Sequence, residues 1–184
     1  MIIAAVRNEK DLELACRSKV NMIFALSSNI HTLEGMVEKV HASGKKLFLH
    51  MDLTEGIGRD KPGLEYVKKK GVDGIISTRV NIIKAAREVG LFTVQRFFIV
   101  DSQSVSTTLE YIKSSRPDMI EVMPGTVTKV ITSLKTKTEI PIIAGGLIET
   151  RQEIDEAMNS GAAGVSTGKK ELWERKRRIE YVKG

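Results

Sequence analysis

The sequence predicts a compact (β/α)8 barrel of the TIM type, with short loops. Short apolar runs alternate with amphipathic stretches eight times along the chain. The apolar runs begin 19 to 27 residues apart, which is about the length of one βα unit. They are apolar enough to be covered on both faces, as the strands of a parallel sheet are. Eight is also the number of strands that closes such a barrel.

The eight expected strands follow one another at regular intervals. They are 2–6 (IIAAV), 21–26 (NMIFAL), 46–52 (KLFLHMD), 73–78 (DGIIST), 92–99 (FTVQRFFI), 119–123 (MIEVM), 140–144 (IPIIA) and 163–167 (AGVST). The chain has 184 residues, whereas barrels of this type usually need at least about 200. We therefore expect one or two stunted helices, namely the first helix and the segment after Ser27. An open, doubly wound sheet is the alternative, and the positions of the glycines favour the barrel.

The segments between the strands are predicted as helices. Thr150 and Glu153 have the spacing of a capping box, which opens a helix. Another helix is expected to end at Arg116, because Pro117 cannot continue it. Apolar residues also recur with helical spacing in segments 82–89 and 127–134. Glycines expected to terminate helices in the left-handed conformation are Gly71, Gly90 and Gly161.

Composition indicates one domain, residues 1–184, without a linker. The single cysteine, Cys16, excludes an internal disulfide and a cysteine-based zinc site, and it is expected to be a small buried residue of the first helix. No apolar run approaches the roughly 20 residues of a membrane-spanning helix, and the N-terminus does not resemble a signal peptide. The expected location is the cytoplasm.

The positive charge of the chain is concentrated near its C-terminus. Residues 169–184 contain seven Lys or Arg and three Glu, a net charge of +4, whereas the whole chain carries +6. This segment is expected to form a basic last helix. It is either the solvated face of a helix that docks on the barrel or a surface for an anionic polymer.

Two glycine-rich turns predict a phosphate-binding site. Gly145 and Gly146 follow the seventh expected strand, and Ser166, Thr167 and Gly168 end or follow the eighth. In barrels of this type the loops after strands 7 and 8 form a recurrent phosphate site. Glycines let backbone N–H groups approach an oxyanion, and hydroxyl groups and a helix N-terminus add donors. The alternative is that these residues form only tight turns and caps.

Polar residues at the ends of strands 3 to 6 are candidates for contact with the rest of the ligand. His50 and Asp52 have the same parity in their strand, and of the two Asp52 is the preferred candidate at the rim. Gln95 and Arg96 have opposite parity, so only one of them can point inward. Glu121 is the natural counter-charge for an inward Arg96. The candidates are Asp52, Arg79, Gln95, Arg96 and Glu121.

No catalytic motif accompanies these residues. The sequence contains no HExxH, Walker P-loop, GxSxG or Cys/His cluster. No catalytic residue, metal or cofactor is therefore predicted. The spacing of residues alone predicts a small phosphorylated ligand in the mouth of a barrel.

Several longer strings resemble the glycerol-3-phosphate-responsive antiterminator family. They include HMDLTEGIGRD (50–60), VQRFFIVDS (94–102), EVMPG (121–125), AGGLI (144–148) and GAAGVSTGKKELW (161–173). The resemblance runs from about Ile2 to Trp173. It implies a barrel-shaped regulator without a catalytic step. Such a regulator binds glycerol 3-phosphate, acts on the leader mRNA of glycerol-utilisation genes and prevents premature termination of transcription.

The resemblance also implies a surface that binds RNA. The basic C-terminal segment, which a homodimer would double, is the expected surface, and its candidate residues are Arg175, Lys176, Arg177 and Arg178. A TIM-barrel enzyme that acts on a small phosphate ester is the alternative function, because barrels with this phosphate site are mostly enzymes.

Overall fold

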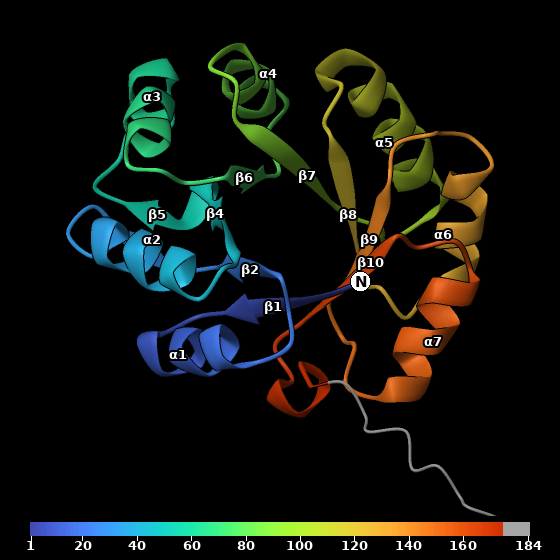
Figure 1. The fold of residues 1–184 in the computed structure, drawn as a ribbon. Coiled ribbons are helices and arrows are strands. Elements are labelled where there is room, and N and C mark those ends of the chain that lie inside the picture. Colours follow the sequence, from blue (N-terminus) through green and yellow to red (C-terminus); the bar gives the residue numbers. More distant parts are fainter. Residues whose placement is uncertain (175–184) are drawn as a thin grey trace, which may run out of the picture.

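Eight parallel strands close into a barrel that is surrounded by helices (Figure 1). The structure is a computed structural model, and it describes residues 1–174. Around the barrel the strands are ordered β1-β10-β9-β8-β7-β6-β4-β2, so the last strand pairs with the first. The predicted fold, a compact barrel of the TIM type, is confirmed.

All eight expected strands are present, and their ends lie within two residues of the predicted ends. The barrel strands are β1 (Ile2–Val6), β2 (Met22–Ala25), β4 (Lys46–His50), β6 (Gly74–Ser77), β7 (Phe92–Phe98), β8 (Met119–Met123), β9 (Ile142–Gly145) and β10 (Gly164–Thr167). A small sheet was not predicted: β3 (Ser28–Asn29) pairs in parallel with β5 (Thr54–Glu55). Each of these strands has only two residues, too few to show a hydrophobic period.

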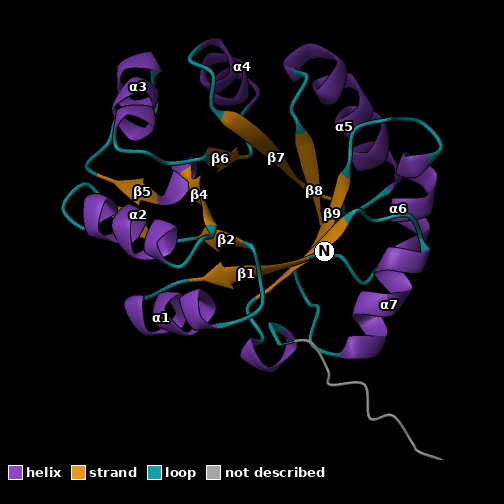
Figure 2. Cartoon of the chain, in the orientation of Figure 1, coloured by secondary structure: helices purple, strands orange, loops and turns teal. Residues whose placement is uncertain are grey.

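The helices lie outside the ring of strands (Figure 2). They are α1 (Glu9–Arg17), α2 (Leu33–Ala42), α3 (Lys61–Lys69), α4 (Val80–Glu88), α5 (Ser102–Ser115), α6 (Thr128–Lys135) and α7 (Arg151–Asn159), with 3-10 turns η1 (Met51–Leu53) and η2 (Lys170–Leu172). The expectation of stunted first helices is wrong, because α1 and α2 have 9 and 10 residues, as long as α4 and α7. After β10 the described chain forms only η2. The remainder of the predicted last helix, 175–184, lies outside the described residues.

The predicted helix ends are confirmed in atomic detail. The side chain of Thr150 accepts a hydrogen bond from the backbone of Glu153, whose carboxylate accepts one from the backbone of Thr150. Arg116 ends α5 in the left-handed conformation, with φ of 48°. The three helix-terminating glycines also have positive φ, namely 88° at Gly71, 77° at Gly90 and 103° at Gly161.

Apolar side chains fill both the inside and the outside of the barrel. The interior cluster contains Ile3, Phe24, Phe48, Ile76, Val94 and Ile143, all at most 2% exposed. Two further clusters occupy the layer between the strands and the helices. Because the interior is packed solid below the strand ends, a ligand can enter only at a mouth of the barrel.

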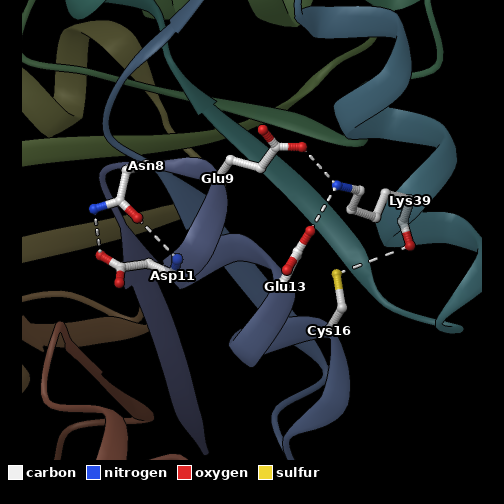
Figure 3. Close-up of polar contacts among 6 residues, drawn as sticks. All are labelled: Asn8, Glu9, Asp11, Glu13, Cys16 and Lys39. Atoms are coloured by element: carbon white, nitrogen blue, oxygen red, sulfur yellow. Dashed lines mark hydrogen bonds and ion pairs between the residues drawn. The ribbon is translucent and has the colours of Figure 1, made fainter.

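Polar contacts join α1 to α2 along the surface (Figure 3). The ammonium group of Lys39 lies 2.8 Å from a carboxylate oxygen of Glu9 and 3.4 Å from one of Glu13. The Sγ atom of Cys16 lies 3.8 Å from the carbonyl oxygen of Lys39, and Cys16 is half-buried. Exposed ion pairs of this kind contribute little to stability, so these contacts orient α1 rather than hold the barrel together.

Among the described residues, none of the helices combines the length and the apolar character that a bilayer-spanning helix needs.

Two helical glycines offer a matched test of packing. A Cβ atom at Gly63, in α3, would overlap the carbonyl group of Gly58, whereas one at Gly35, in α2, would meet nothing within 4 Å. We expect Gly63→Ala to lower the free energy of unfolding by about 1–3 kcal/mol. Gly35→Ala should raise it by up to about 1 kcal/mol, because alanine favours the helix. Urea denaturation measures both, and equal effects would contradict the packing described here.

Candidate ligand-binding site

A cavity of about 180 Å³ opens among the carboxyl ends of β1, β7, β8, β9 and β10. Residues 146–148 and 166–168 form one wall, and Arg7, Arg96 and Glu121 are the charged residues of the lining. Ala5, Leu26 and Met123 add apolar surface. The volume is below the roughly 300–1,000 Å³ of pockets for drug-sized ligands, so the cavity suits a ligand of few heavy atoms.

The two glycine-rich turns lie side by side, as the sequence predicts. Strand β10 pairs with β9, and Ser166 is opposite Gly145. The hydroxyl of Thr167 donates a hydrogen bond to the carbonyl of Ile148 at 2.7 Å and accepts one from the backbone of Lys169 at 3.0 Å. Thr167 therefore holds the two turns together, and its hydroxyl proton is already used within the protein.

Backbone N–H groups of both turns are left without acceptors. In residues 1–174 no oxygen accepts a hydrogen bond from the N–H of Leu147, Ile148 or Gly168, and all three residues line the cavity. Gly146 and Leu147 turn the chain in the left-handed region, with φ of 72° and 59°. A leucine rarely adopts this conformation, and its side chain here is 69% exposed. Convergent, unpaired N–H groups of this kind form a site for an oxyanion.

Gly145 serves a different purpose from its neighbour. A Cβ atom at this position would collide with the carboxylate of Glu121 and would lie 2.8 Å from the hydroxyl of Ser166. Gly145 does not itself line the cavity in the described residues. Its missing side chain makes room for a buried polar group, whereas Gly146 shapes the turn.

Arg96 and Glu121 form a buried ion pair across β7 and β8. Their closest atoms, Nε and Oε2, are 2.6 Å apart, and the two side chains are 8% and 1% exposed. The hydroxyl of Ser166 donates a hydrogen bond to the other carboxylate oxygen of Glu121, at 2.5 Å. The predicted pairing of these two charges is confirmed, and Arg96 is the inward residue of the Gln95–Arg96 pair. Both charged side chains line the cavity, so the pair also presents polar atoms to a ligand.

Gln95 points the other way, into the layer between β7 and α5. Its side-chain oxygen accepts a hydrogen bond from the hydroxyl of Ser115, and its amide nitrogen has no partner in the described residues. Gln95 is therefore not among the residues that surround the cavity.

Asp52 lies at the rim but is occupied by the protein. Strand β4 ends at His50 and Asp52 belongs to η1, so the expectation that the two share a face of one strand is wrong. Its carboxylate accepts hydrogen bonds from the hydroxyl of Ser77 at 2.8 Å and from the backbone and hydroxyl of Thr78 at 2.8 and 3.0 Å. Burial raises the pKa of Asp52, but these hydrogen bonds together hold it below its ordinary value. Arg79 approaches only to 3.9 Å and is half-exposed.

His50 is a buried titratable residue that the sequence analysis passed over. It is 5% exposed, and its Nδ1 atom has no hydrogen-bond partner among the described residues. Burial lowers the pKa of His50 to about 4, and the positive charge of Arg96 adds to this shift. The imidazole is therefore neutral at pH 7. Its parity with Phe48, a residue of the barrel interior, is the signal that could have identified it.

Arg7 was also missed. It directly follows β1, is exposed and lines the cavity beside the turn after β10. It forms no ion pair with a carboxylate in the described part of the chain, so its charge remains available. In a closed barrel the first strand neighbours the eighth, so the residue after the first strand lies beside the turn that follows the eighth. This rule could have identified Arg7 as a candidate for the site.

The basic residues proposed for RNA, Arg175 to Arg178, lie outside the described residues. Within residues 1–174 no group of three or more His, Cys, Asp or Glu side chains is placed to hold a metal ion.

The buried imidazole should make stability depend on pH. The unfolded chain binds a proton on His50 below about pH 6.5, whereas the folded protein binds it only near pH 4. The free energy of unfolding should therefore fall by about 2 kcal/mol from this residue as the pH drops from 7 to 5. Urea denaturation at both pH values should show this loss in the wild type and not in His50→Leu. An equal loss in both proteins would contradict the assignment.

Three comparisons with known proteins agree with this architecture. The family model described as "Glycerol-3-phosphate responsive antiterminator" matches residues 2–173. The crystal structure of a glycerol uptake operon antiterminator regulatory protein from Listeria monocytogenes is 35% identical, with a TM-score of 0.88, and the match covers 94% of each chain. A glycerol uptake operon antiterminator-related protein from Thermotoga maritima is 32% identical, with a TM-score of 0.84 and coverage of 94% of this chain and 96% of that one.

A curated relative extends the comparison to a third bacterium. The "uncharacterized protein YgcP" of Escherichia coli K12 is 38% identical over 173 residues, which are 94% of this chain and 91% of the relative. The family model and these relatives each cover nearly the whole described barrel, including both turns of the cavity. The chain belongs to the glycerol-3-phosphate responsive antiterminator family.

Proposed function

We propose that this protein is a regulator that binds glycerol 3-phosphate in the cavity at the mouth of its barrel. In the ligand-bound form it acts on the leader mRNA of glycerol-utilisation genes and promotes antitermination of their transcription. The observation that carries the proposal is that Leu147, Ile148 and Gly168, whose N–H groups have no acceptor in residues 1–174, all line one small cavity.

The phosphate group would occupy the wall formed by the two turns. At pH 7 a phosphate monoester carries a charge of about −1.5 to −2 and three strong acceptor oxygens. The unpaired N–H groups can donate to these oxygens without a change in the fold, and the guanidinium of Arg7 supplies a positive charge at the same cavity.

The glycerol portion would face the buried ion pair. Glu121 uses its two carboxylate oxygens for Arg96 and Ser166, but each oxygen has a further lone pair that can accept from a ligand hydroxyl. Arg96 donates through Nε to Glu121, which leaves its other N–H groups for the ligand. The pair neutralises itself, so it should tolerate a neutral diol better than a second charged group.

Membership of a regulatory family supports a binding role rather than a catalytic one. An enzyme acting on a phosphate ester is the alternative. Among the described residues that line the cavity, the one carboxylate is that of Glu121, and it is already bound by Arg96 at 2.6 Å and by the hydroxyl of Ser166. A regulator that acts on nascent mRNA would work in the cytoplasm.

Calorimetry with glycerol 3-phosphate tests the ligand assignment. We expect Gly168→Ala, whose new methyl group would meet only the carbonyl of Ala5 at 3.6 Å, and Arg7→Gln each to weaken binding by about tenfold. The matched controls, Gly35→Ala and Arg59→Gln, change residues that do not line the cavity and should bind as the wild type does. A wild type without affinity for the ligand, or cavity variants that bind normally, would refute the assignment.

A gel shift tests the regulatory step. The wild type should retard a leader transcript of a glycerol-utilisation gene only when glycerol 3-phosphate is present, because ligand and RNA must favour the same state. Neutralising Arg175, Lys176, Arg177 and Arg178 together should weaken this complex while leaving ligand affinity unchanged. Conversion of the ligand to a product, seen by NMR, without any RNA complex would select the enzyme instead.

A further inference from the structure

Positive charge is unevenly distributed over the barrel, although the described chain is almost neutral. Residues 1–174 contain 24 Lys or Arg and 22 Asp or Glu, a net charge of +2. Three hollows, one at the amino-terminal end of the barrel and two between neighbouring helices, are lined by eight Lys or Arg and four Asp or Glu, a net charge of +4. The rest of the described chain therefore carries −2. We call the residues that line these hollows the basal basic surface.

The three hollows are neighbours that share lining residues, and we call them together the groove. The first lies under the barrel and is lined by Lys46 and Phe92, the first residues of β4 and β7. It shares Arg87 with the second, which runs between α4 and α5, and the second shares Glu88 with the third, between α3 and α4. Their volumes are about 530, 470 and 560 Å³. The groove thus crosses the ends of three helices.

The acidic residues of this surface are largely occupied. Asp73 accepts a hydrogen bond from the backbone of Leu47 at 2.9 Å and lies 2.9 Å from the ring of His41. Asp118 accepts hydrogen bonds from the backbone and hydroxyl of Thr93 at 2.8 and 2.7 Å.

Several of the cations, by contrast, are unpaired. Lys46, Lys84, Lys113 and Arg116 are exposed and form no ion pair with a carboxylate in residues 1–174. These four side chains are therefore available to contact an external anion.

An exposed aromatic ring lies among these cations. Phe92 is 40% exposed and packs edge-on against the buried Phe48, with ring centroids 5.6 Å apart. Lys46 and Arg87 line the same hollow. A partly exposed aromatic ring in the same hollow as two cations is an arrangement on which a nucleic-acid base can stack while its phosphates contact the charges.

The helix dipole explains the presence of only some of the cations on this surface. Lys68, Lys69, Arg87 and Lys113 lie in the last turns of their helices, where a cation complements the helix dipole. Lys46 begins a strand and gains nothing from a helix dipole, and Phe92 carries no charge. The cations and the exposed ring together point to a single-stranded polyanion.

We infer that the basal basic surface also contacts the RNA, away from the ligand cavity. The inference rests on the proposed function and adds a second RNA contact, on the described barrel, to the one expected at residues 175–178. The first hollow of the groove is lined by the beginnings of strands and the second reaches the ends of α4 and α5, whereas the cavity lies at the carboxyl ends of the strands. Ligand and RNA therefore occupy separate sites and can be bound at the same time.

The test compares two triple variants of equal charge change. Lys46→Gln/Lys84→Gln/Lys113→Gln neutralises the basal basic surface. Lys10→Gln/Arg59→Gln/Lys129→Gln removes the same charge from exposed positions at the other end of the barrel. Fluorescence anisotropy measures the affinity for a labelled leader transcript with saturating glycerol 3-phosphate, over a range of salt concentrations. Calorimetry with glycerol 3-phosphate shows whether each variant still binds the ligand and is therefore folded.

We expect the basal variant to bind RNA at least about tenfold more weakly, and the slope of log affinity against log salt to become shallower by about 2, since three phosphate contacts are lost. The control variant should resemble the wild type, and Phe92→Leu should weaken binding without changing the slope. Unchanged RNA affinity in the basal variant, or an equal loss in the control variant, would overturn this inference but not the proposed function. Absence of RNA binding by the wild type would overturn the proposed function as well.

Discussion

The interior of this barrel depends on one buried ion pair. A carboxylate such as Glu121 cannot remain charged inside a protein unless it is paired and hydrogen-bonded. Arg96 on one neighbouring strand and Ser166 on β10 meet this requirement, and the close approach of the carboxylate requires a glycine at position 145. The need to pair the buried charge of Glu121 on β8 thus constrains which residues can occupy the facing positions on β7, β9 and β10. These are the strands whose carboxyl ends surround most of the cavity, so the requirement that stabilises the interior also shapes the candidate site.

The eight strands could be predicted from the sequence because each apolar run is bounded by strong turn signals. The pairing of Arg96 with Glu121 could be predicted because a buried arginine needs a counter-charge. Asp52 could not be placed, since β4 gives way to a 3-10 turn and the alternation of faces stops there. His50 was compared with Asp52 and set aside, because parity alone does not show that its ring is buried. Arg7 was missed because it becomes part of the site only when the barrel closes and brings β1 beside β10.

Charge shows the same difference between sequence and structure. Along the chain the largest excess of basic residues lies in 169–184, with a net charge of +4. Folding brings together cations from α3, α4, α5 and the start of β4, which are far apart in the sequence. Windows such as 61–70 and 79–87 each carry a net charge of +3, but the sequence alone does not show that they lie on one surface. Parallel topology is the cause, because it places every helix end and every strand start at the same end of the barrel.

The only tryptophan of the chain gives this architecture a built-in optical reporter. Trp173 is 2% exposed, and its indole N–H donates a hydrogen bond to the carbonyl of Thr167, a residue of the cavity wall. Indole fluorescence responds to the polarity and hydrogen bonding around the ring. Emission from a single, dry chromophore one hydrogen bond from the cavity can therefore follow occupancy in unlabelled protein, without competing signal from other tryptophans.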